Sequence, residues 1–162
     1  MIKNDYKIYD FNLDFHAELL LLAKKAWHFT YSNIMKPDVL NERLNDWYSE
    51  QNHKGISENV KNGKYFFKVV FLNKQMVGFV SGNVNEQKLD RLYIDPDEIG
   101  KGLGALLLQM FIDELIKVNK KTCLLYCDKN NSIGIKFYKK KGFVIVEEDE
   151  EDYKMVKNIE VF

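Results

Sequence analysis

Residues 95–111 read DPDEIGKGLGALLLQMF and place three glycines, at positions 100, 102 and 104, between a strand-like segment and a helix-like one. The preceding segment, 88–94, reads KLDRLYI, and its apolar and aromatic residues predict a strand. From residue 102 to about residue 118, apolar residues recur at the spacing of an amphipathic helix. Glycines at such a junction allow a ligand to approach the backbone closely, so the junction is a candidate binding site.

Two nucleotide-binding motifs fit this junction poorly. A Walker A loop requires Gly-Lys-Ser/Thr, whereas Lys101 is followed by Gly102. A dinucleotide fingerprint, G-x-G-x-x-A, is satisfied by Gly100, Gly102 and Ala105, with Asp128 ending the next predicted strand. Five residues nevertheless separate the strand from the first glycine, and only about 35 residues follow Asp128, too few for a second mononucleotide-binding half. A dinucleotide-binding protein is therefore the weakest alternative.

A pyrophosphate held by backbone N–H groups fits the junction better. The first amides of a helix have no partner within the helix, and they carry a partial positive charge. Successive amides at glycines also form a concave site for anions. These properties are the ones needed to bind coenzyme A. The alternative that the glycines only form a turn stays open, although a turn needs one glycine rather than three.

The rest of the chain predicts an α+β fold in a single domain spanning residues 1–162. Further strands are expected at 5–9, 64–72, 76–84, 121–127 and in a hairpin over 143–159, and further helices at 13–31, 36–50, 57–63 and 131–142. One crossover unit comprises segment 88–94, the helix after it and segment 121–127. The two strands of this unit should therefore be parallel. We expect a mostly antiparallel, twisted sheet of about seven strands, with this one parallel β-α-β crossover and helices on both faces.

Composition excludes several classes of protein. Lys plus Arg and Asp plus Glu number 24 each, and this zero balance argues against a nucleic-acid or membrane-surface protein. No apolar run approaches the roughly 18 residues that span a bilayer, and MIKNDYKIYDF lacks the apolar core of an export signal. Cys123 and Cys127 lie about 13 Å apart on a strand, too far for a disulfide, and no histidine accompanies them. We therefore expect a cytoplasmic protein without a metal site.

Two motifs together resemble the GNAT family of N-acetyltransferases. Residues 99–104, IGKGLG, are similar to the family motif Q/R-x-x-G-x-G/A, and residues 131–143, NSIGIKFYKKKGF, are similar to N-x-x-A-x-x-F-Y-x-x-x-G-F. Their order is the family's, and the resemblance extends from about Leu89 to Phe143. One departure is Ile99, which stands where the family has Gln or Arg, so binding would rest more on backbone amides and Lys101.

The resemblance implies acetyl-CoA or coenzyme A as co-substrate and assigns its contacts. The implied cofactor-binding residues are Leu92, Tyr93, Ile94, Ile99, Gly100, Lys101, Gly102, Leu103, Gly104, Ala105, Asn131 and Tyr138. Lys140 is added for its charge, which would attract the phosphates, although a solvated helix end explains it equally well. A backbone amide in residues 92–94 would stabilise the oxyanion of a tetrahedral intermediate if the strand bulges there. Asn131 is equally suited to capping the helix that follows it.

Residues 27–31, WHFTY, resemble a segment of PaiA-type polyamine acetyltransferases, which implies that the first two helices border the acceptor site. Trp27, His28 and Tyr31 are therefore candidate substrate residues, although a lone histidine on a mostly apolar helix, such as His28, more often has a packing role. Asp90 is a further candidate, as the nearest acidic residue on the strand before the glycines. A general base is not singled out, because Glu18, Glu42 and Asp46 are alternatives to Asp90.

The resemblance implies that Tyr138, in the second motif, is the catalytic residue: the departing thiolate needs a proton, and a phenol can donate it. The alternative is a packed aromatic residue next to Phe137. The acceptor would be a primary amine, with polyamines such as spermidine and spermine first and a protein N-terminus or lysine as the alternative. An acidic run at 147–152 would attract a polycation if it lies near the acceptor site.

Two further expectations concern the protein as a whole. The alternative to an enzyme is a non-catalytic acyl-CoA-binding sensor domain. The departure from the family motif at Ile99 is compatible with such a loss of turnover. As partners, we expect the small-molecule amine, no nucleic acid and no membrane. The family resemblance is also compatible with a homodimer.

Overall fold

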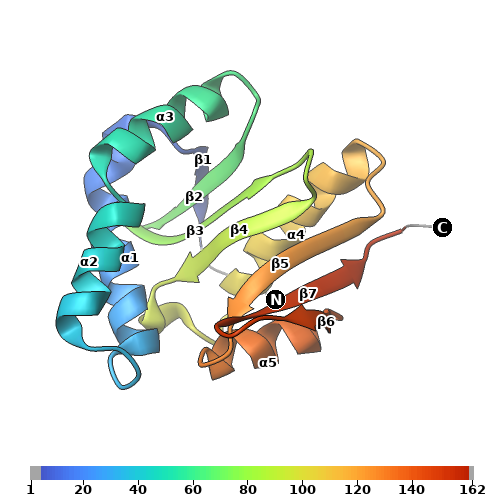
Figure 1. Cartoon of the computed structure of the whole chain (residues 1–162). Coiled ribbons are helices and arrows are strands. Elements are labelled where there is room, and N and C mark those ends of the chain that lie inside the picture. Colours follow the sequence, from blue (N-terminus) through green and yellow to red (C-terminus); the bar gives the residue numbers. More distant parts are fainter. Residues whose placement is uncertain (1–4, 161–162) are drawn as a thin grey trace.

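A computed structural model describes residues 5–160, and its centre is one sheet of seven strands in the order β1-β2-β3-β4-β5-β7-β6 (Figure 1). The strands are β1 Lys7–Asp10, β2 Phe66–Leu72, β3 Gln75–Asn83, β4 Lys88–Ile94, β5 Thr122–Asp128, β6 Val144–Glu148 and β7 Asp152–Asn158. β4 and β5 pair in parallel, and the other neighbours pair antiparallel. The predicted mixed sheet with a single parallel crossover is confirmed.

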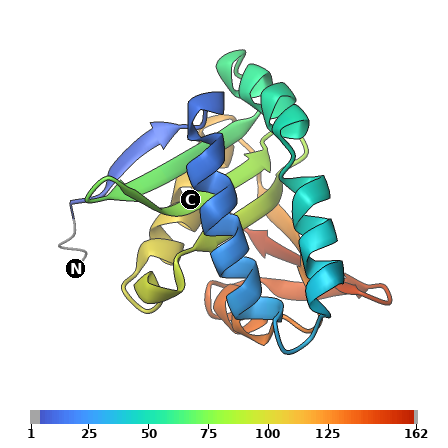
Figure 2. The same ribbon diagram turned by 90° about the vertical axis from the view of Figure 1, so that its left-hand side faces the viewer.

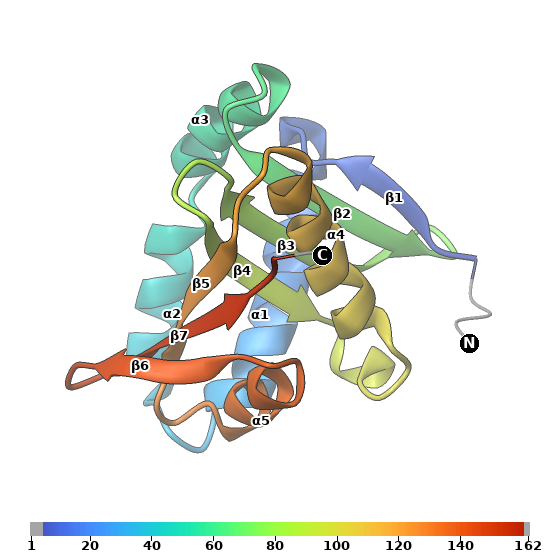
Figure 3. The same ribbon diagram turned by 90° about the vertical axis from the view of Figure 1, so that its right-hand side faces the viewer.

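Helices cover both faces of the sheet, as the sequence predicts. The helices are α1 His16–Tyr31, α2 Pro37–Trp47, α3 Glu50–Lys61, α4 Leu103–Lys117 and α5 Ser132–Lys140, with short 3-10 turns η1 Leu13–Phe15 and η2 Pro96–Glu98. Figure 2 shows α1, in blue, crossing one face with α2 and α3 beside it. Figure 3 shows α4 and α5 on the opposite side.

The boundaries of α3 differ from the prediction. The sequence suggests one helix over 36–50 and a separate helical turn over 57–63, whereas the chain forms a continuous helix from Glu50 to Lys61. The Ser49 side chain caps it by accepting a hydrogen bond from the amide of Asn52 at 3.2 Å. Its inward face consists of the buried His53 with the partly buried Ile56 and Val60, so a histidine stands where a periodic pattern would have an apolar residue.

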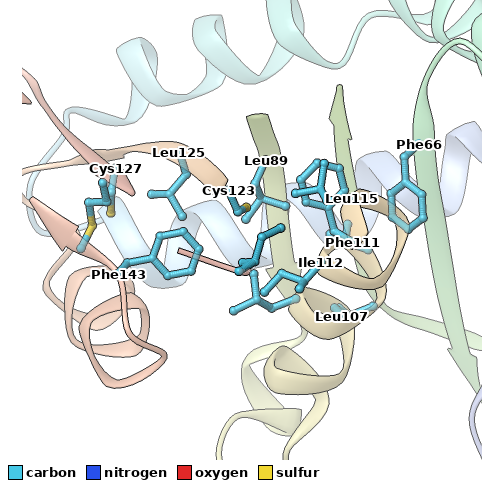
Figure 4. Close-up of a cluster of buried hydrophobic side chains, with 14 of the residues drawn as sticks. Phe66, Leu89, Leu107, Phe111, Ile112, Leu115, Cys123, Leu125, Cys127 and Phe143 are labelled. Carbon is cyan, nitrogen blue, oxygen red and sulfur yellow. The ribbon is translucent and has the colours of Figure 1, made fainter. Parts of the chain in front are cut away.

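The crossover unit encloses one of two hydrophobic cores (Figure 4). Leu107, Phe111 and Leu115 recur every four residues on α4, so they form one stripe that is fully buried against the sheet. The helix lies so close to the strands that a Cβ atom at Gly82 would come within 2.6 Å of the Phe111 ring. This packing fixes the start of α4, where the glycine junction lies, next to the end of β4.

A second core lies under α1 and α2 and contains a pair of histidines. His53 is fully buried, and its Nδ1 atom lies 2.7 Å from the Nδ1 atom of His16, so one ring donates a hydrogen bond to the other. Burial lowers the pKa of His53 from 6.5 to about 4, and the positive charges of Arg91 and His16 add to this shift.

Protonation of the His53 imidazole should lower the free energy of unfolding in acid. Because the folded-state pKa is depressed, the unfolded chain binds a proton that the folded chain excludes between pH 6.5 and about 4. The stabilisation is fully present above pH 6.5 and falls by about 3 kcal/mol as the pH approaches 4. Urea unfolding between pH 7.5 and 4.5 measures this loss. The His53→Phe variant should show a flatter profile, and an identical profile in the variant would contradict the assignment.

No helix within residues 5–160 is long and apolar enough to cross a membrane. In the same residues, His, Cys, Asp and Glu side chains nowhere gather in groups of three or more that would hold a metal ion. Cys123 and Cys127 are buried free thiols.

Candidate active site

β4 and β5 separate after a short paired stretch, which opens the sheet at its centre (Figure 1). Their parallel register comprises only Lys88 with Leu124 and Leu89 with Leu125. On the other edge of β4, Gly82 pairs with Leu89 and Ser81 pairs with Arg91, so the residue between them is bulged. A bulge increases the local twist of a strand, which directs the rest of β4 away from β5.

The open edge of β4 presents backbone donors. The amide of Asp95 donates to the carbonyl of Val77 on β3 at 2.8 Å. Because successive residues of a strand direct their amides to opposite edges, Tyr93 also faces β3, and the N–H groups of Leu92 and Ile94 face the opening. These two donors are positioned to bind the carbonyl groups of a ligand that lies between the strands.

The glycine junction supplies a second group of donors beside this opening. Gly100 and Gly102 have φ values of +85° and +89°, which favour glycine, and Gly102 immediately precedes α4 without a side-chain cap. Within residues 5–160, nothing accepts a hydrogen bond from five amides of the junction, namely those of Gly100, Gly102, Leu103, Gly104 and Ala105. Free amides at a helix N-terminus are suited to binding an anion.

Four segments surround a cleft of about 380 Å³ at this place. They are α1, the end of β4, the glycine junction with the first turn of α4, and α5. The lining residues are Ala26, Phe29, Thr30, Leu92, Tyr93, Ile94, Pro96, Ile99, Gly100, Gly102, Gly104, Ala105, Asn131, Ile133, Gly134, Phe137, Tyr138, Lys140 and Lys141. The cleft therefore joins the two motifs that lie far apart in the sequence.

Most residues named as cofactor contacts line this cleft, and two do not. Lys101 lies outside the lining, with its Nζ atom 3.5 Å from a carboxylate oxygen of Glu98. The Leu103 side chain is fully buried in the first core, so only its amide faces the site. Ile99 lines the cleft and is 42% exposed.

The four residues named for the acceptor are not among those that line the cleft. Trp27 and Tyr31 are buried in the second core. His28 borders a separate surface depression on the outer side of α1. Asp90 accepts a hydrogen bond of 2.6 Å from the Tyr65 hydroxyl.

From α1, it is Ala26, Phe29 and Thr30 that line the cleft. Phe29 and Thr30 follow Ala26 by three and four positions, so they share its face of the helix. Sequence reasoning did not name them, and this spacing is the signal that could have identified them.

Tyr138 lies on α5 between the rings of Phe137 and Phe143, with ring centroids 5.2 and 5.6 Å away. Burial raises the pKa of its hydroxyl well above the ordinary value, and Cys127, Cys123 and Tyr31 contribute further when ionised. The phenol therefore stays protonated at neutral pH and can donate a proton. At the start of the same helix, the Asn131 side chain accepts from the Gly134 amide at 3.0 Å, which is the capping role.

Two phenols, Tyr93 and Tyr138, line the cleft. Burial raises the pKa of Tyr93 well above its ordinary value, and smaller contributions come from Tyr48, Tyr31 and Tyr138. Behind Tyr93, the Trp27 ring lies 6.2 Å from the Tyr93 ring and 6.2 Å from the Tyr48 ring. Tyr48, which closes α2, was not recognised from the sequence, because its position depends on how α2 packs against β4.

The chain resembles known proteins over most of its length. The model of the acetyltransferase (GNAT) family matches residues 24–143. A spermidine N(1)-acetyltransferase from Thermoplasma acidophilum is 30% identical over 151 residues, covering 88% of this chain and 90% of the relative.

Solved structures extend this likeness to the fold. The crystal structure of the PaiA N-acetyltransferase from Thermoplasma acidophilum in complex with coenzyme A has a TM-score of 0.90 at 25% identity, over 95% of this chain and 99% of that one. The ribosomal-protein-S18-alanine N-acetyltransferase from Escherichia coli shares the fold, with a TM-score of 0.68 at 21% identity, over 97% and 96%. The family match and the 30% identical relative show that this protein belongs to the acetyltransferase (GNAT) family.

Proposed function

We propose that this protein transfers an acetyl group from acetyl-CoA to a primary amine, and that the amine is a polyamine such as spermidine or spermine. The relative named as a spermidine N(1)-acetyltransferase supports the acceptor, and the coenzyme A complex of the PaiA structure supports the donor. The observation that carries the proposal is the group of five free amides beside the opening between β4 and β5.

The cleft has the groups that coenzyme A requires. The free amides from Gly100 to Ala105 would hold the pyrophosphate, assisted by the positive end of α4. Lys140 and Lys141 on the cleft wall add positive charge for the phosphates. The open edge of β4, at Leu92 and Ile94, would hold the amide groups of the pantetheine arm as an added strand does.

The residues at the inner end of the cleft would then promote transfer of the acetyl group. The amine attacks as the neutral base, so a C–N bond forms and the carbonyl oxygen becomes an oxyanion. An amide of β4 donates to the oxyanion of this tetrahedral intermediate. The C–S bond breaks when the intermediate collapses, and Tyr138 donates its proton to the departing thiolate. The amine nitrogen releases one proton to solvent, and the Tyr138 phenolate takes one proton back from it.

A panel of amines tests the acceptor directly. Thiol release from acetyl-CoA should be fastest with spermidine or spermine and slower with a peptide bearing a free N-terminus or a lysine. Faster turnover of either peptide would instead indicate a protein acetyltransferase. Tight coenzyme A binding without thiol release from any amine would refute the proposed reaction.

The proposal also includes a cytoplasmic location and a homodimer. Two buried free thiols are compatible with a reducing compartment. The strand β6 forms one edge of the sheet, and Val144, Ile145 and Val146 are all exposed there, so a second copy could pair with it. Sedimentation of the chain, with Ile145→Lys as the variant, measures the oligomeric state: a dimer that dissociates in the variant supports the pairing, and a monomeric wild type refutes it.

A further inference from the structure

Two carboxylates face each other across neighbouring strands next to the proposed acceptor site. Asp128 at the end of β5 pairs in register with Asp152 at the start of β7. Cys127 points into the core under α4 and α5, so by alternation Asp128 points to the opposite face of the sheet, where α1 and α2 lie. Tyr126 shares that face and is 51% exposed, which leaves the surface beside the carboxylates open.

Neither carboxylate is neutralised within the part of the chain that the structure describes. No ion pair involves Asp128 or Asp152. Asp128 accepts one hydrogen bond, from the amide of Asn130 at 2.8 Å. Burial raises the pKa of Asp152, and the negative charges of Asp149 and Asp128 raise it further, whereas the more distant Arg43 lowers it. An additional cation bound here would relieve this repulsion.

A buried tyrosine lies at the end of α1, on the face of the sheet to which the carboxylates point. Tyr31 is only 6% exposed, and across residues 5–160 its hydroxyl makes no hydrogen bond yet is not sealed from solvent. It directly follows Thr30, which lines the cleft, and the carbonyl of Asp128 accepts a hydrogen bond of 3.0 Å from the amide of Asn131, another lining residue. Burial raises the pKa of the Tyr31 phenol, and the negative charge of Asp128 raises it further. An unpartnered hydroxyl in this position is suited to an amine ligand that also reaches the carboxylates.

We propose that Asp128 and Asp152 bind the second ammonium group of the acceptor, while its reacting amine lies between the hydroxyls of Tyr31 and Tyr138. The inference rests on the proposed acetyl transfer and adds the residues that select the substrate. One amine must be neutral to attack, but the other stays protonated at neutral pH because its pKa is near 10. The carboxylate pair therefore favours diamines and polyamines over monoamines of the same length.

The test compares amines that differ in this second charge. Spermidine, 1,4-diaminobutane and pentylamine are suitable, since pentylamine has a methyl group where the diamine has its second ammonium. In the Asp128→Asn and Asp152→Asn variants, kcat/KM for spermidine should fall about tenfold each, with little change for pentylamine. The asparagine at 128 keeps the oxygen that accepts from Asn130, so the local turn is preserved. Glu150→Gln, in the β6–β7 hairpin, is the matched control for general charge removal.

The outcomes separate the selectivity from the reaction itself. A wild-type preference for spermidine over pentylamine that shrinks in both variants, and a weaker salt dependence in the variants, would support the inference. Equal losses for all three amines, or an unchanged preference in both variants, would overturn it while leaving the acetyl transfer intact. Absence of acetylation of every amine by the wild type would overturn the proposed function, and this inference with it.

Discussion

Replacing Tyr138 with phenylalanine should lower kcat by about 10² to 10³-fold, which is the usual contribution of a general acid. The ring packs between Phe137 and Phe143, and phenylalanine preserves that packing, so the fold and the cleft are retained. Only the proton donor is lost, and the thiolate must then leave without protonation. Thiol release at saturating spermidine measures the effect, and calorimetric titration with coenzyme A should give an affinity within about twofold of wild type.

The control for this variant is Tyr153→Phe. Tyr153 lies on β7, packs against the same core and does not line the cleft, so its hydroxyl should be dispensable. The pH profile gives a second criterion, because burial keeps the pKa of Tyr138 high and the phenol stays protonated in mildly alkaline solution. Near wild-type turnover in Tyr138→Phe, with normal coenzyme A binding, would exclude this residue as the acid.

Replacing Gly104 with valine should weaken coenzyme A binding by about tenfold or more, equivalent to at least about 1.4 kcal/mol. Gly104 is in the first turn of α4, and both it and Phe137 line the cleft. A Cβ atom at position 104 would lie 3.4 Å from the Phe137 ring, which is ordinary contact, so the helix itself tolerates it. The larger side chain would instead occupy the space where the pyrophosphate meets the amides.

Gly55→Ala is the matched control for this substitution. Gly55 is also a helical glycine, and a Cβ atom there would meet nothing within 4 Å. We expect it to raise the free energy of unfolding by about 0.5–1 kcal/mol and to leave coenzyme A binding unchanged. Urea unfolding of both variants separates a binding defect from a folding defect. Wild-type affinity in a stably folded Gly104→Val variant would contradict the proposed pyrophosphate site.

The crossover unit was predictable because its signals are local. Short-range sequence patterns indicate each of its parts. These parts are the three glycines, the stripe of Leu107, Phe111 and Leu115, and the apolar run of β5. By contrast, α3 has a mostly polar sequence, and its inward face combines His53 with the partly buried Ile56 and Val60, so the apolar pattern alone did not indicate its full length.

The sequence also indicated most residues on the glycine and α5 walls of the cleft, whereas the α1 wall was less accessible from sequence. The separation of β4 from β5 depends on a bulge and a two-residue register, and neither leaves a pattern in either strand. Similarly, the segment WHFTY indicates α1 but does not say which of its sides faces the cleft. The pairing of Asp128 with Asp152 joins positions 24 residues apart and depends on the hairpin register.

The most direct test is a crystal structure of this chain grown with coenzyme A. Our account predicts the pyrophosphate oxygens within about 3.2 Å of amides between Gly102 and Ala105, with the pantetheine arm along Leu92 and Ile94 and the sulfur near Tyr138. A coenzyme A molecule bound elsewhere, or bound through the lysines with those amides unengaged, would contradict it.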